Sequence, residues 1–299
     1  MRTHLFVPLA LSLAACTGTV DPPDEQANIV IEGQVVPTDV GLACAGESSD
    51  AQAARVAIAT VRAYVGLPPL SCDPRATAAA QAHCTYVDLN RIFSHTEVKG
   101  NAGFTGVTVT DRLAAAKFTL EPSGEVMATL VGSAAVMDWR GFMNSVYHRP
   151  FFLRAESTVF GYGGTASCAT FDFGRPKKSV PSAVPVVWPP DGAANVPRAF
   201  RADHETPNPM PGSTEVGSPI SWVGNPSLTK IDVKVYGPLG QIPIVVLTKD
   251  NDPAKLVRAG EVHVIPKAAL APRTQYSVTF RGTAGDKALL YRTTFTTGD

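Results

Sequence analysis

The sequence predicts an α+β protein built from two domains. Apolar residues recur at helical spacing through an alanine-rich first half, the second half alternates apolar and polar residues, and a proline-rich segment lies between them. The chain has 299 residues, which is enough for two domains with a core each. It carries 26 basic and 26 acidic residues, a balance that argues against a nucleic-acid-binding protein, because phosphates require a basic surface.

The first 16 residues are typical of an export signal. A short basic segment, residues 1–4, precedes an apolar run over 5–15 that is too short to span a membrane. The run ends Leu13-Ala14-Ala15-Cys16, which resembles the bacterial lipobox. This resemblance implies that Cys16 is lipidated, so we expect an exported, membrane-anchored lipoprotein at the outer membrane or cell surface. An ordinary signal peptide with a chance cysteine is the alternative.

Residues 17–43 are predicted to form a tether. They contain five acidic residues and no Lys or Arg, and Asp21-Pro22-Pro23-Asp24 cannot continue a helix. Residues 29–31 and 35–36 can still form one strand, so the tether need not lack structure throughout.

Four cysteines remain when the lipobox cysteine is set aside: Cys44, Cys72, Cys84 and Cys168. An even number in an exported protein favours two disulfides, with three possible connectivities. A metal cluster is the alternative, but no Cys-x2-Cys spacing is present.

The first domain, residues 44–175, combines predicted helices and strands. Ser48, Ser49 or Asp50 can cap a helix that ends at Gly66, and Asp73-Pro74 begins a second helix. The remaining elements expected here are helices over 111–117 and 133–145 and strands over 158–162 and 169–173.

The second domain is predicted to be all-β. Five prolines over 176–190 indicate a stiff linker, and beyond it strands such as 231–236 and 276–281 alternate apolar and polar residues. This period predicts a β-sandwich over 183–299. Its two ends, at 189–197 and 270–298, resemble bacterial Ig-like domains of the Big_5 type, which are usually spacers or interaction modules.

An ordered set of short motifs runs through residues 48–174. The motifs are Gly66-Leu67-Pro68-Pro69-Leu70, Asp73-Pro74, Ala79-Ala80-Gln81-Ala82-His83, Phe93-Ser94-His95-Thr96, Asp111-Arg112-Leu113, Gly124-Glu125, Met143-Asn144-Ser145, His148-Arg149 and Val159-Phe160-Gly161-Tyr162-Gly163. The set resembles the bacterial branch of the CAP superfamily, the SCP-like domains of cysteine-rich secretory proteins, antigen 5 and pathogenesis-related proteins. The resemblance implies a CAP-type α-β-α sandwich, whose cleft can hold two histidines and two acidic residues.

By motif, this resemblance places His95, Glu125 and His148 in the cleft as catalytic or metal-binding residues. Two imidazoles and a carboxylate can bind zinc or another divalent cation with an open position, and zinc can lower the pKa of bound water to about 7. The second acidic position falls near Ser145, so that carboxylate is absent, and Val126 stands where the family often has Asn. Both departures weigh against metal chemistry.

Each candidate also has a purely structural interpretation. His95 can be a hydrogen-bonded histidine at a helix end, Glu125 a capping or solvated carboxylate, and His148 the basic end of the fourth helix. Glu97 can replace the missing carboxylate, and Asp138 is no better a candidate for the same role.

Other motifs carry less weight. His83-Cys84 lies on an alanine-rich stripe, which favours packing and a disulfide, and Asp172-Phe173-Gly174 imitates a kinase motif by chance. Ser94 adjoins a histidine, but no Gly-x-Ser-x-Gly elbow supports a serine hydrolase. His204 and His263 have no evident partners in the β domain.

The sequence therefore predicts a cell-envelope lipoprotein whose CAP domain is a non-enzymatic recognition module on an Ig-like spacer. Its expected partners are the membrane, through the lipid anchor, and a lipid, cell-wall or envelope-protein ligand, but no nucleic acid. The alternative is a metal-dependent hydrolase with His95 and His148 as ligands and Glu125 as third ligand or general base. A structural surface protein with a relic cleft is the third hypothesis.

Overall fold

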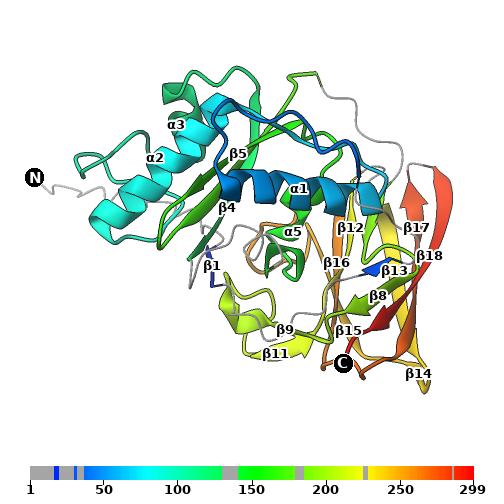
Figure 1. The fold of residues 1–299 in the computed structure, drawn as a ribbon. Coiled ribbons are helices and arrows are strands. Elements are labelled where there is room, and N and C mark those ends of the chain that lie inside the picture. Colours follow the sequence, from blue (N-terminus) through cyan, green and yellow to red (C-terminus); the bar gives the residue numbers. More distant parts are fainter. Residues whose placement is uncertain are drawn as a thin grey trace, which may run out of the picture.

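The computed structural model describes residues 37–129, 141–178, 185–224, 228–284 and 286–299, together with the backbone of two short strands nearer the N-terminus. A part of the chain with helices and strands lies beside a part made almost wholly of strands (Figure 1). This organisation confirms the α+β prediction. Within the described ranges, no helix is long and apolar enough to cross a membrane. The predicted signal, residues 1–16, lies outside these ranges.

The first domain contains the predicted helices and strands that fall on described residues, together with two strands and one short helix that the sequence did not predict. Its helices and strands are α1 (Ser49–Tyr64), β3 (Ser71–Cys72), α2 (Pro74–Asn90), α3 (Val109–Ala115), β4 (Glu121–Thr129), α5 (Arg149–Leu153), β5 (Val159–Gly164) and β6 (Ala169–Arg175). The elements that the sequence did not predict are β3, β4 and α5. The helix expected over 133–145 falls mostly on residues 130–140, outside the described residues.

Local sequence explains where the helices begin. The Ser48 side chain accepts a hydrogen bond from Ala51 N at the start of α1. Asp73 accepts hydrogen bonds from two backbone amides of the first turn of α2, which has proline at its first position. Thr108 and Asp111 form a reciprocal capping box at α3.

Helices cover both faces of the central sheet, in which the strands lie in the order β4-β6-β5-β3. Alternation along the strands divides the side chains between the faces. Phe171 and Phe173 of β6 join the core beneath α1 and α5. Thr170 points to the other face, toward Cys84 of α2. Asp172 is on that face too and lies opposite Glu125 of β4 in the register.

Glycines in β5 let α2 lie directly on the sheet. A Cβ built at Gly163 would lie 2.2 Å from the backbone carbon of Ala80, and one at Gly161 would lie 2.1 Å from that of Ala76. Small residues on both elements therefore set the distance between helix and strand.

Gly163→Ala is expected to lower the free energy of unfolding by about 2 kcal/mol, because the added carbon meets α2 backbone that cannot rotate away. Chemical denaturation measures the change. Gly237→Ala is the control, since its Cβ would meet only the Tyr276 ring, which can move. Equal losses in the two variants would show that close helix–strand packing is not the cause.

The four cysteines form two disulfides, as predicted. Cys44 pairs with Cys72, which fixes the segment before α1 to β3. Cys84 pairs with Cys168, which fixes α2 to the turn before β6. The structure thus selects one of the three connectivities that the sequence leaves open.

Parts of the predicted tether, residues 17–43, lie against the two domains. Strand β1 (Thr17–Thr19) runs parallel to β4, and β2 (Val30–Ile31) pairs with Ala193 and Ala194 of the second domain. Closer to the first domain, the backbone around Leu42 bonds to β3.

Over its described residues, the second domain consists of strands and one short 3-10 helix. Its elements are β7 (Val186–Trp188), β8 (Ala193–Val196), β9 (Ala199–Arg201), η1 (Ala202–His204), β10 (Glu205–Thr206), β11 (Glu215–Gly217), β12 (Ile220–Val223), β13 (Leu228–Gly237), β14 (Gly240–Gln241), β15 (Ile244–Thr248), β16 (Glu261–Pro266), β17 (Gln275–Ala284) and β18 (Lys287–Thr297). The alternating segments predicted around 231–236 and 276–281 lie in β13 and β17.

Two sheets of the second domain share one core. One has the order β15-β16-β12-β7 and the other contains β13, β17, β18 and β8. Trp222 and Val264 from the first sheet pack with Val235 and Phe280 from the second. The structure places the second half of the segment predicted as linker, 176–190, inside this domain, because β7 is buried.

Residues 142–154 of the first domain join it to the second. Val146 and Tyr147 are buried in a cluster with Phe200, Val216 and Ile265. The core beneath α1 likewise includes side chains of β7 and β12. The domains therefore share apolar cores across their boundary.

Buried arginines strengthen this boundary. Arg149 donates to Pro219 O at 2.7 Å and to Ser221 Oγ at 2.8 Å. Burial lowers the pKa of its guanidinium to about 9. Arg154 donates two hydrogen bonds to one carboxylate oxygen of Glu261. A charged group left partly buried without its partner is costly, so the two domains are expected to unfold together.

Candidate functional site

His95 and Glu125 form a hydrogen-bonded pair at the edge of the first domain. His95 lies in the loop after α2, and its Nδ1 donates to Glu125 Oε1 at 2.6 Å. The His95 side chain is 14% exposed and that of Glu125 only 2%. The pair therefore has a buried carboxylate behind an imidazole that reaches the surface.

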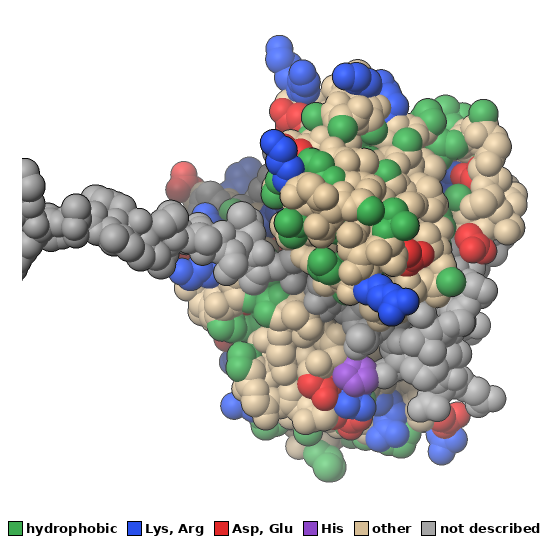
Figure 2. All heavy atoms as spheres, turned by 90° about the vertical axis from the view of Figure 1, so that its left-hand side faces the viewer, with side chains coloured by type: hydrophobic (Ala, Val, Ile, Leu, Met, Phe, Trp, Pro, Cys, Tyr) green, Lys and Arg blue, Asp and Glu red, His purple; other side chains and the backbone are tan. Residues whose placement is uncertain are grey.

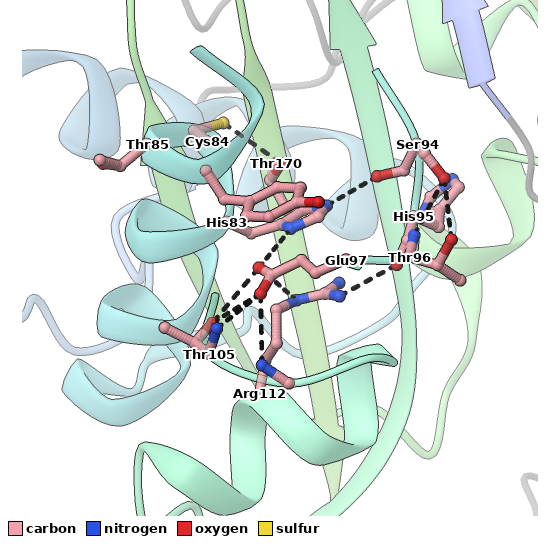
Figure 3. Close-up of polar contacts among 12 residues, drawn as sticks. His83, Cys84, Thr85, Ser94, His95, Thr96, Glu97, Thr105, Arg112 and Thr170 are labelled. Carbon is pink, nitrogen blue, oxygen red and sulfur yellow. Dashed lines mark hydrogen bonds and ion pairs between the residues drawn. The ribbon is translucent and has the colours of Figure 1, made fainter. Parts of the chain in front are cut away.

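Arg112 of α3 holds both members of this pair. Its Nη2 donates to Glu125 Oε2. Its Nη1 donates to the backbone oxygen of His95 at 3.0 Å (Figure 3). Burial alone would raise the pKa of Glu125, but the Arg112 charge and the His95 hydrogen bond outweigh it and hold that pKa well below its ordinary value. Glu125 is thus a carboxylate throughout the neutral range.

A second acid lies behind the pair. Asp172 is fully buried on β6, directly across from Glu125. Burial, followed by the negative charge of Glu125, raises the pKa of Asp172 well above its ordinary value. The neutral form of Asp172 is thus favoured beside the ionised Glu125, as expected for two carboxyl groups that share one site.

Asp172→Asn is expected to keep or raise stability at pH 7.5, because the amide is uncharged at a position where burial and the Glu125 charge disfavour a carboxylate. Because its pKa is raised in the folded state, Asp172 binds its proton more tightly in the folded chain than in the unfolded chain. The stability of the fold therefore falls as pH rises above about 4. Thermal unfolding at pH 7.5 and below pH 4 checks this. A variant clearly less stable than the parent at pH 7.5 would contradict it.

His83 and Glu97 anchor the loop that carries His95. His83 Nδ1 lies 2.9 Å from Glu97 Oε1, and His83 Nε2 donates to Ser94 O at 2.9 Å (Figure 3). Burial lowers the pKa of His83. Both ring nitrogens have hydrogen-bond partners, so the ring is fixed between the Glu97 carboxylate and the Ser94 carbonyl oxygen.

The Glu97 carboxylate is occupied within the loop. It accepts hydrogen bonds from Thr105 N at 2.6 Å and Gly106 N at 3.2 Å. Glu97 therefore holds residues 94–106 together. Its carboxylate is bonded to His83 and not to His95, where a replacement for the missing acidic residue would be needed.

His148 is bonded to the second domain. Its Nδ1 donates to Glu205 Oε1 at 2.8 Å, and the side chain is 1% exposed. Glu205 also accepts from Val146 N and Tyr147 N, so one carboxylate binds three successive residues. The ring of His148 stacks on Phe142. His148 is thus fixed at the domain boundary.

The arrangement of the three residues predicted to bind a metal does not suit a metal ion. A catalytic zinc needs three protein ligands directed at one point. Glu125 is engaged by His95 and Arg112, and His148 is bonded to Glu205. Among the described residues, no group of three or more His, Cys, Asp or Glu side chains can hold a metal ion.

The remaining candidates have structural surroundings. Ser94 Oγ lies 3.1 Å from Thr96 Oγ1, and Ser145 Oγ donates to a backbone oxygen. His263, for which the sequence indicates no partner, lies 2.8 Å from Ser221 Oγ, so that expectation was wrong. Asp138 lies outside the described residues.

Sequence reasoning missed the residues that complete the site, Arg112 and Asp172, and the carboxylate of Glu205. Alternation offered a signal for Asp172, because it shares the parity of Thr170 rather than that of the buried phenylalanines of β6. No pattern in the chain links Arg112 to Glu125, or His148 to a residue 57 positions away.

The helix-covered sheet and the His95–Glu125 pair lie in a part of the chain that matches a known family. Residues 56–173 match the model of the CAP family, described as the Cysteine-rich secretory protein family, and this part of the chain is a CAP domain. The resemblance expected from the motifs is confirmed over this range.

The chain is also similar to a solved structure, a 1.5 Å crystal structure of an extracellular protein containing an SCP domain from Bacillus anthracis str. Ames. The two are 27% identical, with a TM-score of 0.37, over 42% of this chain and 39% of that one. The chain thus spans well under half the length of that protein. No curated protein matches the chain.

Proposed function

We propose that the protein is a cell-envelope lipoprotein whose CAP domain binds a lipid, cell-wall or envelope-protein ligand without turning it over. The observation that carries this proposal is the His95–Glu125 pair, a partly exposed imidazole held by a buried carboxylate and Arg112. A fixed imidazole at the surface is suited to hydrogen bonding with a ligand.

The metal-dependent hydrolase is not favoured. It needs His95, Glu125 and His148 to converge on one ion, whereas Glu205 binds His148 at the domain boundary. The argument against a metal site is therefore that the carboxylates available as ligands already have hydrogen-bond partners within the protein.

Export and lipidation are proposed from the N-terminal sequence. The apolar run and Cys16 support a lipoprotein signal, and two disulfides are typical of proteins that fold in an oxidising compartment. We further propose that the second domain is Ig-like, which its two sheets around one core support. Its buried boundary favours a rigid support for the CAP domain over a loose spacer.

Purified chain carrying Cys16→Ser tests the binding role, because it keeps the whole sequence but lacks the site of lipidation. We expect it to be retained by one envelope fraction among lipid vesicles, cell-wall sacculi and solubilised envelope proteins. His95→Asn should abolish that retention. Lys287→Ala, an exposed change on β18, is the control and should not alter it.

Equal retention of the parent and His95→Asn would contradict a binding role for this site. Robust hydrolysis of an ester or glycan that disappears in Glu125→Gln would contradict the non-enzymatic function. Circular dichroism of each variant verifies folding before either comparison.

A further inference from the structure

An open cavity lies beside the end of α2, and neither His95 nor Glu125 lines it. Its volume is about 410 Å³, which is within the range of small-molecule sites. The lining residues come from α2 and the loop that follows it, from β4 and from the turn before β6, and they are Val87, Asp88, Arg91, Phe93, Thr129 and Ser167. The binding role proposed above uses none of these six residues.

The walls of the cavity are fixed relative to one another. The Cys84–Cys168 disulfide joins α2 to the turn that carries Ser167. Across the same junction, Ser167 Oγ donates a hydrogen bond to Asp88 Oδ1. Phe93 packs against the buried apolar cluster around the disulfide. The cavity is therefore preformed, as most ligand sites are.

Two opposite charges line this cavity. Asp88 and Arg91 are three positions apart at the end of α2, and both residues are exposed. Within the described part of the chain, the Arg91 guanidinium has no hydrogen-bond or ion-pair partner, and the Asp88 carboxylate is bonded to Ser167 alone. Figure 2 shows the side of the molecule on which α2 and the loop after it lie, where basic and acidic side chains are mixed with hydrophobic ones. The cavity thus offers a cation and an anion that can both bond to a ligand.

The backbone of Arg91 has a strained conformation. The residue follows the last turn of α2 with φ of 54° and ψ of 36°, in the left-handed region. Glycine is preferred at such a position, because a Cβ makes the conformation costly. A basic side chain gains from the helix dipole here, but it gains as much within the last turn, where the backbone is unstrained. Strain of this kind is concentrated at functional sites, so it points to a role for the Arg91 side chain.

The polar groups of the cavity define the chemistry of its ligand. The guanidinium only donates hydrogen bonds, the carboxylate only accepts them, and the hydroxyl groups of Thr129 and Ser167 do both. A ligand hydroxyl likewise donates and accepts, so a molecule with several hydroxyl groups can satisfy all four side chains. A strongly anionic ligand would meet the carboxylate, and a strongly cationic one would meet the guanidinium. Val87 and Phe93 provide an apolar wall for the C–H face of a sugar ring.

We infer that this cavity binds a neutral saccharide. The charges of both signs, the two hydroxyl groups and the apolar wall together match a ring that carries hydroxyl groups and no net charge. This inference deepens the proposed function by naming an envelope glycan as the class of ligand, and it rests on that function for export. Phe93 is two residues from His95, so such a ligand would lie beside the loop that carries His95.

Titration calorimetry tests the inference on the whole chain carrying Cys16→Ser. The probes are neutral tetrasaccharides of N-acetylglucosamine, glucose and mannose, with tetragalacturonate as an anionic saccharide and diglycine as a zwitterion. At least one neutral tetrasaccharide should bind, and it should bind more tightly than tetragalacturonate, which brings carboxylates to Asp88. Diglycine should not bind, because it has no hydroxyl groups for Thr129 and Ser167.

Two single variants separate binding from folding. Asp88→Asn keeps an acceptor for Ser167 but loses the charge, and Arg91→Gly removes the guanidinium from a backbone conformation that glycine favours. Each should weaken saccharide binding by about tenfold, the effect of losing a hydrogen bond to a charged group. Arg91→Gly should at the same time keep or raise the melting temperature, whereas a purely structural role for Arg91 predicts a lower melting temperature and an unchanged affinity.

The matched control is Arg201→Gln with Asp203→Asn, which removes an exposed acid–base pair of the second domain and should leave saccharide affinity unchanged. Failure of every neutral tetrasaccharide to bind, or equal affinity of the parent and Arg91→Gly, would overturn the inference. Tighter binding of tetragalacturonate or of diglycine would overturn it too. If the parent is nevertheless retained by an envelope fraction through His95, the proposed function stands, whereas loss of that retention as well would contradict both.

Discussion

Arg112→Met should lower the free energy of unfolding by about 3–5 kcal/mol at pH 7. Removal of the guanidinium leaves Glu125 buried without its cation and takes the neighbouring charge from Glu97, whose oxygen lies 3.9 Å from Arg112 Nε. Breaking a buried ion pair from one side carries a cost of this size, because an uncompensated charge remains in the interior. Denaturant unfolding of the parent and variant measures the change.

The loss should depend on pH in a defined direction. In the parent, the pKa of Glu125 is depressed, so its stabilising contribution is present above about pH 4.3 and is lost as pH falls toward the folded-state pKa. The variant lacks the cation that depresses this pKa. We therefore expect the difference between the two proteins to be largest near neutrality and to shrink below pH 4.

Arg75→Met is the matched control, because its ion pair with Asp73 is 39% exposed on the arginine side. Solvent screening makes the contribution of such an exposed pair to stability small. A loss for Arg112→Met no larger than that of the control would contradict the account of Arg112 as the group that holds the site.

Glu205→Ala should destabilise the boundary between the domains by about 3–5 kcal/mol. The carboxylate accepts from Val146 N, Tyr147 N and His148 Nδ1, and the residue is 3% exposed. Each buried donor left without an acceptor costs about 1–3 kcal/mol. Scanning calorimetry should show one transition for the parent and a lower, broadened or divided transition for the variant.

Glu215→Ala serves as the control for that experiment, because Glu215 is exposed on β11 in the same domain. It should leave the transition unchanged. Two separate transitions in the parent protein would contradict the view that the boundary couples the domains.

Local signals in the sequence predicted much of the first domain. Ser48 and Asp73-Pro74 mark the starts of α1 and α2 because caps act within one turn. Strands β5 and β6 lie where β-branched and aromatic residues predicted them. These features depend on neighbouring residues alone, so they can be recognised in the sequence.

The candidate site was predictable only in part. Family motifs pointed to His95 and Glu125, which the structure brings together. Arg112 and Asp172 reach the pair through tertiary packing, and no spacing reveals which strands become neighbours. The partner of His148 comes from another domain, so nothing within the CAP motifs could indicate Glu205.

The β domain shows the same limit at larger scale. Prolines predicted a stiff connection, and the chain does contain proline on either side of β7, but β7 itself is buried against the CAP core. From the sequence alone, Val186 and Trp188 are assigned to a linker, because their packing partners lie elsewhere in the chain. Burial at a domain boundary depends on both of the surfaces that meet there, whereas a sequence pattern describes only one of them.

Zinc titration calorimetry tests the central claim, that the His95–Glu125 pair is a binding site and not a metal centre. The measurement uses the Cys16→Ser chain, first treated with chelator, beside the same chain with His95→Asn. The account predicts identical titrations for the two proteins. Micromolar or tighter binding by the parent that is lost in His95→Asn would contradict it and would make the metal-dependent hydrolase the better account of this protein.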